Sequence, residues 1–373
     1  MEQVDVCIIG GGMAGASVAY HLVRHANVVL LEREPYVGYH SSGRSAALFH
    51  PQYGSPTIRA LTAASGALFH SPPEGFAPIL TERGSLVIGR ADQQAALSKH
   101  EAVAAASRQS TIRLSAAEVL EKIPALKPAA VDWGLFDPSA MDMDVEALLQ
   151  GYLRAARQHG LRVLTSQEIT SVRRDGLRWR VETPRLEVSA QVVVNAAGAW
   201  ADEVAGIAGV APLKLVPYRR TAFTFDAPAG INSNGWPMVA DAEEQFYFKP
   251  DAGRILGSLS EEVASPPVDV QAEDLDVAVA VDRLEGVLNF PIERVIRSWA
   301  GLRTFGPDRN PVSGFEPSVS GFYWHGAIGG YGIQTSAALG AYAAALILGN
   351  AIPDELVAHG IVAGQLGPAR FRA

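Results

Sequence analysis

The sequence predicts an α/β fold in which two domains are interleaved along the chain. Short apolar runs of the kind that form buried parallel strands occur near the start, in the middle and near the end, at residues 4–9, 191–200 and 322–326. Between them lie segments with the patterns of antiparallel strands and hairpins. Because no tandem repeat or linker separates the two kinds of segment, we expect each domain to be built from several stretches of the chain.

The first part of the chain is a strand–turn–helix–strand pattern over residues 4–32. The run 4–9 leads into residues 10–15, GGGMAG, which match G-x-G-x-x-G, and a helical pattern leads on to the run 28–31 and Glu32. Gly10 permits the tight turn, Gly12 lets a pyrophosphate approach the backbone, and Gly15 allows the helix to pack closely on the strand. Glu32 lies about twenty residues beyond the turn, where a carboxylate accepts hydrogen bonds from ribose hydroxyls. The pattern predicts a bound dinucleotide.

The segment after Glu32 indicates which class of dinucleotide this is. A nicotinamide-binding domain would continue into another βαβ unit, whereas residues 37–47 form a Gly/Ser-rich loop followed by small residues. Small residues and free backbone N–H groups allow a flat ring to approach closely, which favours a flavin.

Composition and charge limit the class of protein. The 373 residues, 48% of them hydrophobic, are enough for two domains. The net charge of −8 and the lack of any Lys/Arg run argue against nucleic acid as a partner. The longest apolar stretch, 337–348, is too short to span a bilayer, and the acidic start argues against a signal peptide, so we expect a cytoplasmic protein. The single cysteine, Cys7, excludes an intramolecular disulfide and a Cys-rich metal site, and no metal is expected.

The rest of the chain alternates between helical and strand patterns. Helices are expected at residues 58–68, 92–105, 142–158 and 272–288, from Ser115 with Glu118 completing a capping box, and from residue 333 onwards. Strands are expected at residues 84–89, 133–137, 162–164, 169–174, 178–182, 187–190, 218–225, 246–249 and 254–258. Asp142 and Asp144 are expected to cap a helix start rather than bind a metal.

An ordered set of motifs resembles those of the flavin-dependent D-amino acid dehydrogenase/oxidase superfamily. The motifs are IIGGGMAGAS, LERE, GYHSSGRSAA, QGYLRAAR, VNAAGAWADEVAG, RRTAF, FYFKPDAG, WAGLRTF and GGYGIQTSAALG. The chain looks closest to bacterial D-arginine dehydrogenases, and sarcosine and glycine oxidases are more distant. The resemblance covers nearly the whole chain and implies FAD bound in an extended form.

The resemblance also implies the division into domains. A Rossmann-like FAD-binding domain of the glutathione-reductase type would comprise residues 1–80, 142–212 and 306–373. It would be interleaved with an α+β substrate domain, residues 81–141 and 213–305, built on a mixed, largely antiparallel sheet.

The same resemblance assigns the residues that hold the cofactor. They are Gly10, Gly12, Met13, Ala14, Gly15, Glu32, Arg33, Ser41, Arg44, Ser45, Ala46, Ala47, Val172, Ala196, Ala197, Gly198, Gly329, Gly330, Tyr331, Gly332, Ile333, Gln334 and Thr335. Residues 329–335 would place N–H groups at the pyrimidine edge of the flavin, where a helix N-terminus stabilises the negative charge of the reduced ring. Family members with covalent flavin use a cysteine in the C-terminal half. This chain has none there, so we expect non-covalent FAD.

For the substrate, the resemblance assigns Arg220 and Arg303 to a carboxylate, with Tyr247 as a third donor and Tyr53 in a lid over the site. Arginine suits this task because its guanidinium group binds a carboxylate in a bidentate manner. Leu48, Ser85, Gly330 and Gln334 match other positions that face the substrate. His50 is either a group that tunes protonation of the substrate amine or a packing residue.

Two departures from the D-arginine enzymes bear on the substrate. Those enzymes carry a glutamate for the guanidinium where this chain has Ser85, and an active-site histidine where it has Leu48. Without the glutamate the main reason to bind a cationic side chain is lost, and Leu48, Phe49 and Met238 make the pocket more apolar. We therefore expect neutral, hydrophobic D-amino acids as substrates.

The implied reaction is hydride transfer from the substrate Cα to flavin N5, followed by hydrolysis of the imino acid to a 2-oxo acid and ammonia. The electron acceptor, which is oxygen, a quinone or another carrier, stays open. Three alternatives remain: an oxidase for glycine, sarcosine or a cyclic secondary amine, a 2-hydroxy acid dehydrogenase of the same fold, which is less favoured, and a flavoprotein subunit with no turnover of its own.

Overall fold

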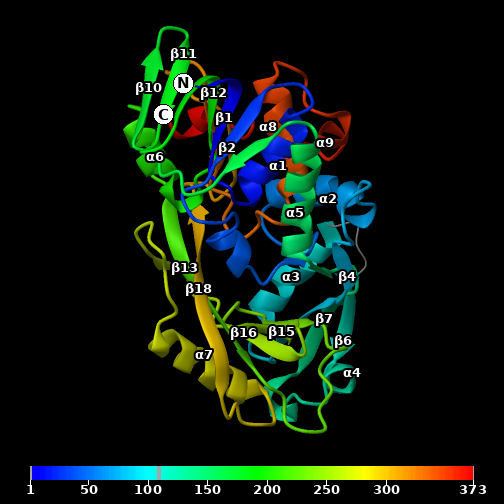
Figure 1. Cartoon of the computed structure of the whole chain (residues 1–373). Coiled ribbons are helices and arrows are strands. Elements are labelled where there is room, and N and C mark those ends of the chain that lie inside the picture. Colours follow the sequence, from blue (N-terminus) through cyan, green and yellow to red (C-terminus); the bar gives the residue numbers. More distant parts are fainter. Residues whose placement is uncertain (1, 107–110, 373) are drawn as a thin grey trace.

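The structure is a computed structural model that describes residues 2–106 and 111–372. Its first sheet lies in the upper half of Figure 1 and has the strand order β10-β11-β12-β1-β2-β9, with β20 beside β12 and β19 beside β20. The strands are β1 (Glu2–Ile9), β2 (Val28–Leu31), β9 (Arg162–Leu164), β10 (Ser171–Asp175), β11 (Arg178–Glu182), β12 (Glu187–Asn195), β19 (Val312–Phe315) and β20 (Phe322–Gly326). Strands β20, β12, β1, β2 and β9 run parallel, and the remaining pairs are antiparallel.

Helices cover both faces of this first sheet, and its central strands are buried where they lie between the helices, at residues 6–9 of β1, 28–31 of β2 and 193–195 of β12. On one face pack α1 (Met13–Leu22), α5 (Val145–Gln158) and α8 (Ser336–Ile347), and α2 (Pro56–His70) and α9 (Asp354–Ala358) continue this layer. On the other face, α6 (Ala201–Ile207) packs with the β10–β11 hairpin. The four residues of β2 are all buried, as a strand enclosed on two sides requires.

The second sheet lies in the lower half of Figure 1 and is mixed but largely antiparallel. Its order is β17-β13-β16-β15-β14-β5-β7-β6, with β18 beside β13, and only the β14–β5 pair among those described is parallel. The strands are β5 (Ser85–Gly89), β6 (Ile112–Ser115), β7 (Trp133–Asp137), β13 (Val216–Phe225), β14 (Met238–Asp241), β15 (Tyr247–Asp251), β16 (Arg254–Ser258), β17 (Val263–Ala264) and β18 (Val295–Phe305). Helices α3 (Gln94–Ala106), α4 (Ala116–Lys122) and α7 (Asp274–Val287) pack around it.

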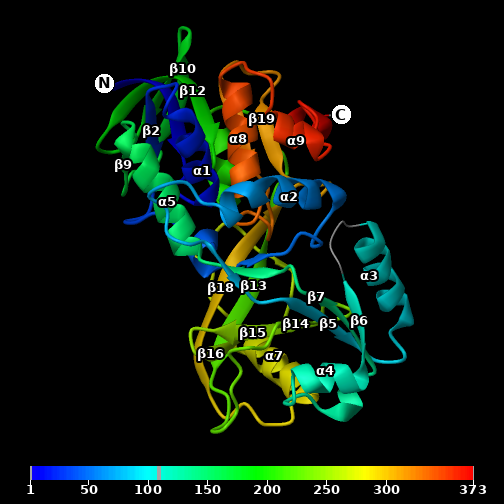
Figure 2. The same ribbon diagram turned by 90° about the vertical axis from the view of Figure 1, so that its right-hand side faces the viewer.

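Short segments and two long strands connect the halves. A small sheet of β3 (Leu48–Phe49), β8 (Met141–Met143) and β4 (Leu80–Glu82) lies where the chain crosses from one half to the other. Both views show β13 and β18 running side by side from the second sheet up to the first (Figures 1 and 2). The 3-10 turns are η1 (Ser41–Arg44), η2 (Pro128–Ala130), η3 (Gly198–Trp200) and η4 (Pro368–Phe371).

The predicted fold class is confirmed, and several local expectations change. Residues 187–195 form one strand, where two separate strands were expected, and β14, β18 and β19 were not expected at all. The capping box of Ser115 and Glu118 is confirmed. Asp144 caps α5 by accepting a hydrogen bond from Ala147 N at 2.8 Å, but Asp142 lies in β8, so its expected role as a cap is wrong. Helix α8 begins at Ser336 rather than at residue 333.

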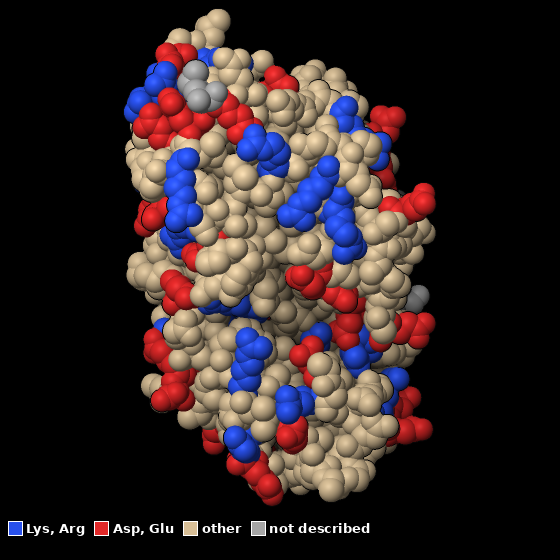
Figure 3. Space-filling model, in the orientation of Figure 1, with Lys and Arg blue, Asp and Glu red and all other residues tan. Residues whose placement is uncertain are grey.

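Charged side chains of both signs lie on the face shown in Figure 3, where acidic and basic groups are interspersed. Among residues 2–106 and 111–372, no helix has the length and apolar character needed to cross a membrane. The same residues contain no group of three or more His, Cys, Asp or Glu side chains arranged to hold a metal ion.

Candidate active site

The turn between β1 and α1 has the geometry that the glycine pattern predicts. Gly10 has a φ of +112°, and a Cβ atom there would lie 2.3 Å from Ala196 O. A Cβ at Gly15 would lie 2.0 Å from Gly10 O, so the helix reaches the strand only because Gly15 has no side chain. No side chain caps the start of α1, and its first turn has no acidic residue. The positive end of the helix is therefore available to an anion.

Glu32 fixes this turn while facing the same space. Its Oε2 accepts a hydrogen bond from Gly11 N at 2.6 Å, and its Oε1 accepts one from Glu34 N at 2.8 Å. The residue is 9% exposed and lines the cavity described next. Since each carboxylate oxygen has a second lone pair, Glu32 retains the capacity to bind ribose hydroxyls.

A long first cavity begins at this turn and ends between the two sheets. It is lined by most of the predicted cofactor residues, namely Gly10, Gly12, Met13, Ala14, Glu32, Arg33, Ser41, Arg44, Ser45, Ala46, Ala196, Ala197, Gly198, Gly329, Gly330, Gly332 and Ile333. Further lining residues that were not predicted include Tyr39, His40, Ser42, Trp200 and the segment 167–169. Ser42 also joins two walls of the cavity, because its Oγ accepts a hydrogen bond from Met13 N at 2.9 Å.

Six predicted cofactor residues do not line the first cavity. Gly15 and Val172 are packed against neighbouring elements, and Val172 lies in the apolar core between β10 and α6. The chain reaches the cavity at residues 167–169, before β10 begins, and the contact of Val172 with the cofactor stays a prediction. Ala47 and Gln334 line a second cavity instead, and Tyr331 and Thr335 line neither of the two. The Thr335 hydroxyl donates to Tyr331 O at 2.8 Å and so braces the loop before α8.

The second cavity adjoins the first and is lined by all the residues that were assigned to the substrate site. These residues are Leu48, His50, Tyr53, Ser85, Arg220, Tyr247, Arg303, Gly330 and Gln334. Phe49, which was expected to make this pocket apolar, does not line it, because its side chain is buried against Phe69 and His70. Residues that line both cavities form a shared wall, to which Arg220, Tyr247 and Arg303 belong. A ligand in the second cavity would therefore meet the end of a ligand in the first.

Pairing of β13 with β18 brings the two arginines together. Arg220 lies opposite Gly301, and Arg303 lies opposite Tyr218, so Arg220 and Arg303 are diagonal neighbours on one face of the antiparallel pair. A Cβ atom at Gly301 would lie 3.4 Å from Arg44 Cβ. Burial and the nearby charge of Arg303 lower the pKa of Arg220. Two guanidinium groups in one enclosed space favour an anion such as a carboxylate between them.

Other protein groups, among them the carboxylate of Glu262, also contact these arginines. Arg220 Nε donates to Glu261 O at 2.8 Å, and its Nη2 lies 3.6 Å from Glu262 Oε1. A Cβ at Gly330 would lie 2.9 Å from Arg303 Cζ, so the guanidinium group of Arg303 packs directly on the backbone of the loop before α8. The absence of a side chain at Gly330 thus sets where Arg303 lies.

The second cavity also contains a histidine paired with an aspartate. His50 was expected at the site from the sequence, and Asp137 was not. His50 Nε2 lies 3.3 Å from Asp137 Oδ2, and Asp137 Oδ1 accepts hydrogen bonds from Ser139 N at 2.9 Å and Ser139 Oγ at 2.6 Å. Burial raises the pKa of the Asp137 carboxyl, but the hydrogen bonds from His50 and Ser139 outweigh burial and leave this pKa below its usual value. The carboxylate is therefore ionised at neutral pH.

Asp137 reaches the cavity through strand pairing. It lies opposite Ser85, and it was missed because residues 85 and 137 are far apart in sequence. A second buried charge, Lys249, is paired with Asp142 at 2.7 Å, and Asp142 also accepts a hydrogen bond from Arg83 at 2.7 Å. Lys249 is thus paired with a carboxylate, whereas Asp137 has Ser139 as its hydrogen-bond donor and His50 as its neighbour.

The segment with Tyr53 closes one side of the second cavity. The rings of Tyr53 and His50 stack with their centroids 6.2 Å apart. The ring of Tyr53 also packs against that of Tyr331, with a distance of 5.1 Å between the centroids. His50 N donates to Gln334 Oε1 at 3.1 Å, which ties this segment to the loop before α8.

Comparison with known proteins decides the family. A family model described as "FAD dependent oxidoreductase" matches residues 5–346. The chain belongs to this family. Dimethylglycine dehydrogenase of Rattus norvegicus is 25% identical over 400 residues, which cover 99% of this chain but only 45% of that protein. The chain therefore spans less than half the length of this relative.

Solved structures share the fold. The L-proline dehydrogenase of P. horikoshii has a TM-score of 0.82 at 22% identity and covers 100% of this chain and 98% of its own. The glycine oxidase of Geobacillus kaustophilus has a TM-score of 0.81 at 22% identity, covering 94% of this chain and 96% of its own. The protein is an FAD-dependent oxidoreductase, and the first cavity fits its cofactor: glycines at the turn and an uncapped helix start suit the pyrophosphate, and Glu32 suits the ribose.

Proposed function

We propose that the protein oxidises the Cα–N bond of D-amino acids with neutral, preferably hydrophobic side chains. The observation that carries this proposal is the position of Arg220 and Arg303 in the wall shared by the two cavities. A substrate carboxylate bound there would hold the adjacent Cα next to the cofactor. Bound FAD supplies the hydride acceptor. The imino acid leaves the site and reacts with water to give a 2-oxo acid and ammonia.

The chain's own residues bind and orient the substrate. Arg220, Arg303 and the Tyr247 hydroxyl would hold the carboxylate, and Tyr53 would cover the site from the loop that follows β3. His50, held by Asp137, lies on the opposite side, where its imidazole would accept a proton from the substrate amine so that the amine reacts in its neutral form. Gly330 and Gln334 would contact the amine side.

The lining of the second cavity supports a neutral side chain. Leu48, Val87, Leu135, Met238 and Ala240 supply apolar surface. The Asp137 carboxylate is occupied by His50 and Ser139, which weakens its attraction for a cationic side chain. Preference for the D-enantiomer rests on the resemblance of the motifs to the D-amino acid dehydrogenases.

A second candidate is the oxidation of a small secondary or N-methylated amine. The names of the similar proteins favour it, because they include a dimethylglycine dehydrogenase, an L-proline dehydrogenase and a glycine oxidase. In either case the electron acceptor is a second substrate, with oxygen and quinones as the candidates.

An anaerobic titration of the purified protein distinguishes these functions. Loss of the flavin absorbance near 450 nm, about the usual maximum of oxidised flavins, would be followed with D- and L-amino acids, glycine, sarcosine and proline. We expect D-leucine, D-methionine or D-phenylalanine to bleach the flavin faster than D-arginine. Bleaching by sarcosine or proline alone would favour the second candidate, and a flavin that no amine bleaches would indicate a subunit without turnover.

We also propose that FAD is bound non-covalently. Cys7, the single cysteine, is fully buried in β1 and cannot reach the ring. Acid precipitation should leave all flavin absorbance in the supernatant, and flavin that stays with the protein pellet would contradict this.

A further inference from the structure

One wall of the first cavity is formed by a segment that has no buried core and no helix cap to fix its position. Residues 38–46, which include η1, line the cavity, and η1 has no buried residue and no side-chain cap. A 3-10 turn of four residues is a weak element, so its position depends on contacts with other parts of the chain.

Those contacts come mainly from residues 269–302, which belong to the half of the molecule with the second sheet. Ser41 Oγ donates to Leu302 O at 2.7 Å, Arg44 Nη1 donates to Val270 O at 2.8 Å and to Ala300 O at 3.0 Å, and Trp299 Nε1 donates to Arg44 O at 3.0 Å. Segments more than two hundred residues apart thus form one wall of the cofactor cavity.

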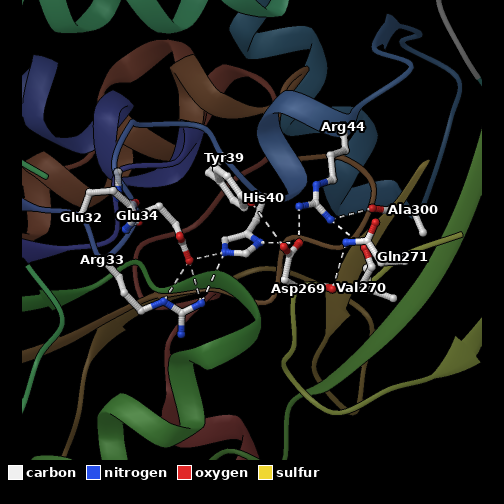
Figure 4. Close-up of polar contacts among 11 residues, drawn as sticks. Glu32, Arg33, Glu34, Tyr39, His40, Arg44, Asp269, Val270, Gln271 and Ala300 are labelled. Atoms are coloured by element: carbon white, nitrogen blue, oxygen red, sulfur yellow. Dashed lines mark hydrogen bonds and ion pairs between the residues drawn. The ribbon is translucent and has the colours of Figure 1, made fainter. Parts of the chain in front are cut away.

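Asp269 is the charged centre of this arrangement. Its Oδ1 accepts a hydrogen bond from Arg44 Nη2, and its Oδ2 accepts one from the Tyr39 hydroxyl at 3.3 Å. His40 Nδ1 lies 3.9 Å from Asp269 Oδ1, and His40 Nε2 lies 2.9 Å from Glu34 Oε1. Figure 4 shows Asp269 between Arg44 on one side and His40 and Tyr39 on the other.

Asp269 itself does not line the cavity, although all three of its partners do. It lies in the loop between β17 and α7, and its side chain is 45% exposed. The next residue, Val270, is buried in an apolar cluster with Ala199, Ala300 and Leu302. Val270 anchors the loop, and Asp269 presents the carboxylate to the segment 39–44. The hydrogen bond from Arg44 also holds the pKa of Asp269 below its usual value, so the group is anionic.

We propose that Asp269 is a positioning residue that fastens the segment 39–44 over bound FAD and thereby controls how fast FAD leaves. The ion pair between Asp269 and Arg44 has to break before this segment can move away from the cavity. Because Asp269 touches the cofactor only through its partners, its loss should affect retention of FAD and not the environment of the flavin ring. The proposal depends on FAD and not on which amine is oxidised.

The test compares Asp269→Asn with wild type as holoenzymes. Release of FAD is followed by the rise in flavin fluorescence after dilution, and we expect release from the variant to be roughly tenfold faster, as loss of a charge-assisted hydrogen bond implies. The visible spectrum of the loaded variant should match that of wild type. Added salt should speed release from wild type, because the pair is partly exposed, and should have a weaker effect on the variant.

Asp226→Asn is the matched control. Like Asp269, Asp226 is paired with an arginine in the half of the molecule with the second sheet: it lies 3.0 Å from Arg254. Asp226 lines neither cavity. Its rate of FAD release should equal that of wild type. The proposal is wrong if Asp269→Asn releases FAD at the wild-type rate, if Asp226→Asn accelerates release equally, or if the flavin proves to be covalently attached.

Discussion

The two adjoining cavities are built in different ways. Close to half of the residues that line the first cavity are glycine, alanine or serine, and many come from motifs that are continuous in sequence, such as residues 12–14 and 196–199. The second is lined by larger side chains from β5, β7, β13, β15, β18 and the loops beside α2 and α8. The first cavity therefore depends on where side chains are missing, and the second on which side chains are present. Substitutions should separate the two.

The largest effect is expected where a side chain is added to the first cavity's turn. Gly15→Ala places a methyl group 2.0 Å from Gly10 O, which forces α1 away from β1. We expect at least about a hundredfold weaker binding of FAD, since the pyrophosphate site is formed by this turn. The ratio of flavin to protein absorbance measures it, with circular dichroism to monitor the fold.

The control for this change is Gly286→Ala in α7. A Cβ atom at Gly286 would have no neighbour within 4 Å, so the same methyl group fits there and FAD should be retained. Full occupancy of Gly15→Ala by FAD would contradict the account of the turn.

A smaller and different effect is expected in the second cavity. Arg303→Met removes a charged donor to the substrate carboxylate and should weaken substrate binding by roughly thirtyfold, or about 2 kcal/mol. The content of FAD should change far less than in Gly15→Ala, because Arg303 lies in the wall shared by the two cavities and not at the turn. The dissociation constant of the substrate comes from the concentration dependence of the rate of flavin bleaching. Arg254→Met, at the exposed start of β16, should bind substrate normally. Loss of FAD with unchanged substrate affinity would reverse the roles given to the two cavities.

The turn of the first cavity could be predicted from one short stretch of sequence, whereas some neighbours in the second cavity could not, and the reason is physical. The positions that need glycine are local in sequence, so GGGMAG alone indicates the turn. Asp137 is different, because only the pairing of β5 with β7 brings it beside Ser85. Asp269 was missed for the same reason, since nothing near it in the sequence indicates a contact with Arg44.

Two strands that the sequence did not indicate lie beside these residues. β14 pairs with β5, and β18 carries Ala300, whose carbonyl oxygen accepts a hydrogen bond from Arg44. β18 lacks a simple alternation of apolar and polar residues. Arg297 and Ser298 are both exposed, and Gly301 and Arg303 line the first cavity. Asp142 fits a helix start by its spacing to α5, but its partners Arg83 and Lys249 lie on other strands or loops. Patterns within one segment could not reveal these pairings.

A moderate effect on stability is expected from the histidine–aspartate pair of the second cavity. The folded-state pKa of Asp137 lies below its unfolded value of about 3.9, so its contribution is complete above about pH 4 and is lost as the pH falls through the folded-state pKa. Asp137→Asn should lower the unfolding free energy by about 1–2 kcal/mol at neutral pH. Melting temperatures between pH 7 and the acid limit measure it, and the difference from wild type should shrink below about pH 4.

This change also sharpens the comparison of the cavities. Asp137 lines only the second cavity, so FAD affinity should stay the same. A difference in stability that grows on acidification would show that the carboxylate is not held in its ionised form by His50 and Ser139.

The smallest effect is expected outside both cavities. Ser115→Ala removes the cap of α4, where Ser115 Oγ accepts a hydrogen bond from Glu118 N at 3.4 Å, and should cost about 1 kcal/mol of stability. Chemical denaturation measures this loss. FAD content and substrate affinity should equal those of wild type, and a change in either would mean that the second sheet's periphery is coupled to the site.

The most direct test of the proposed function is the consumption of a racemic substrate. Racemic leucine is incubated with the enzyme and an artificial electron acceptor, and the remaining enantiomers, the 2-oxo acid and ammonia are quantified. The account predicts that only D-leucine disappears and that each molecule consumed yields one 2-oxo acid and one ammonia. Consumption of L-leucine, or no consumption while sarcosine or proline is oxidised, would contradict it.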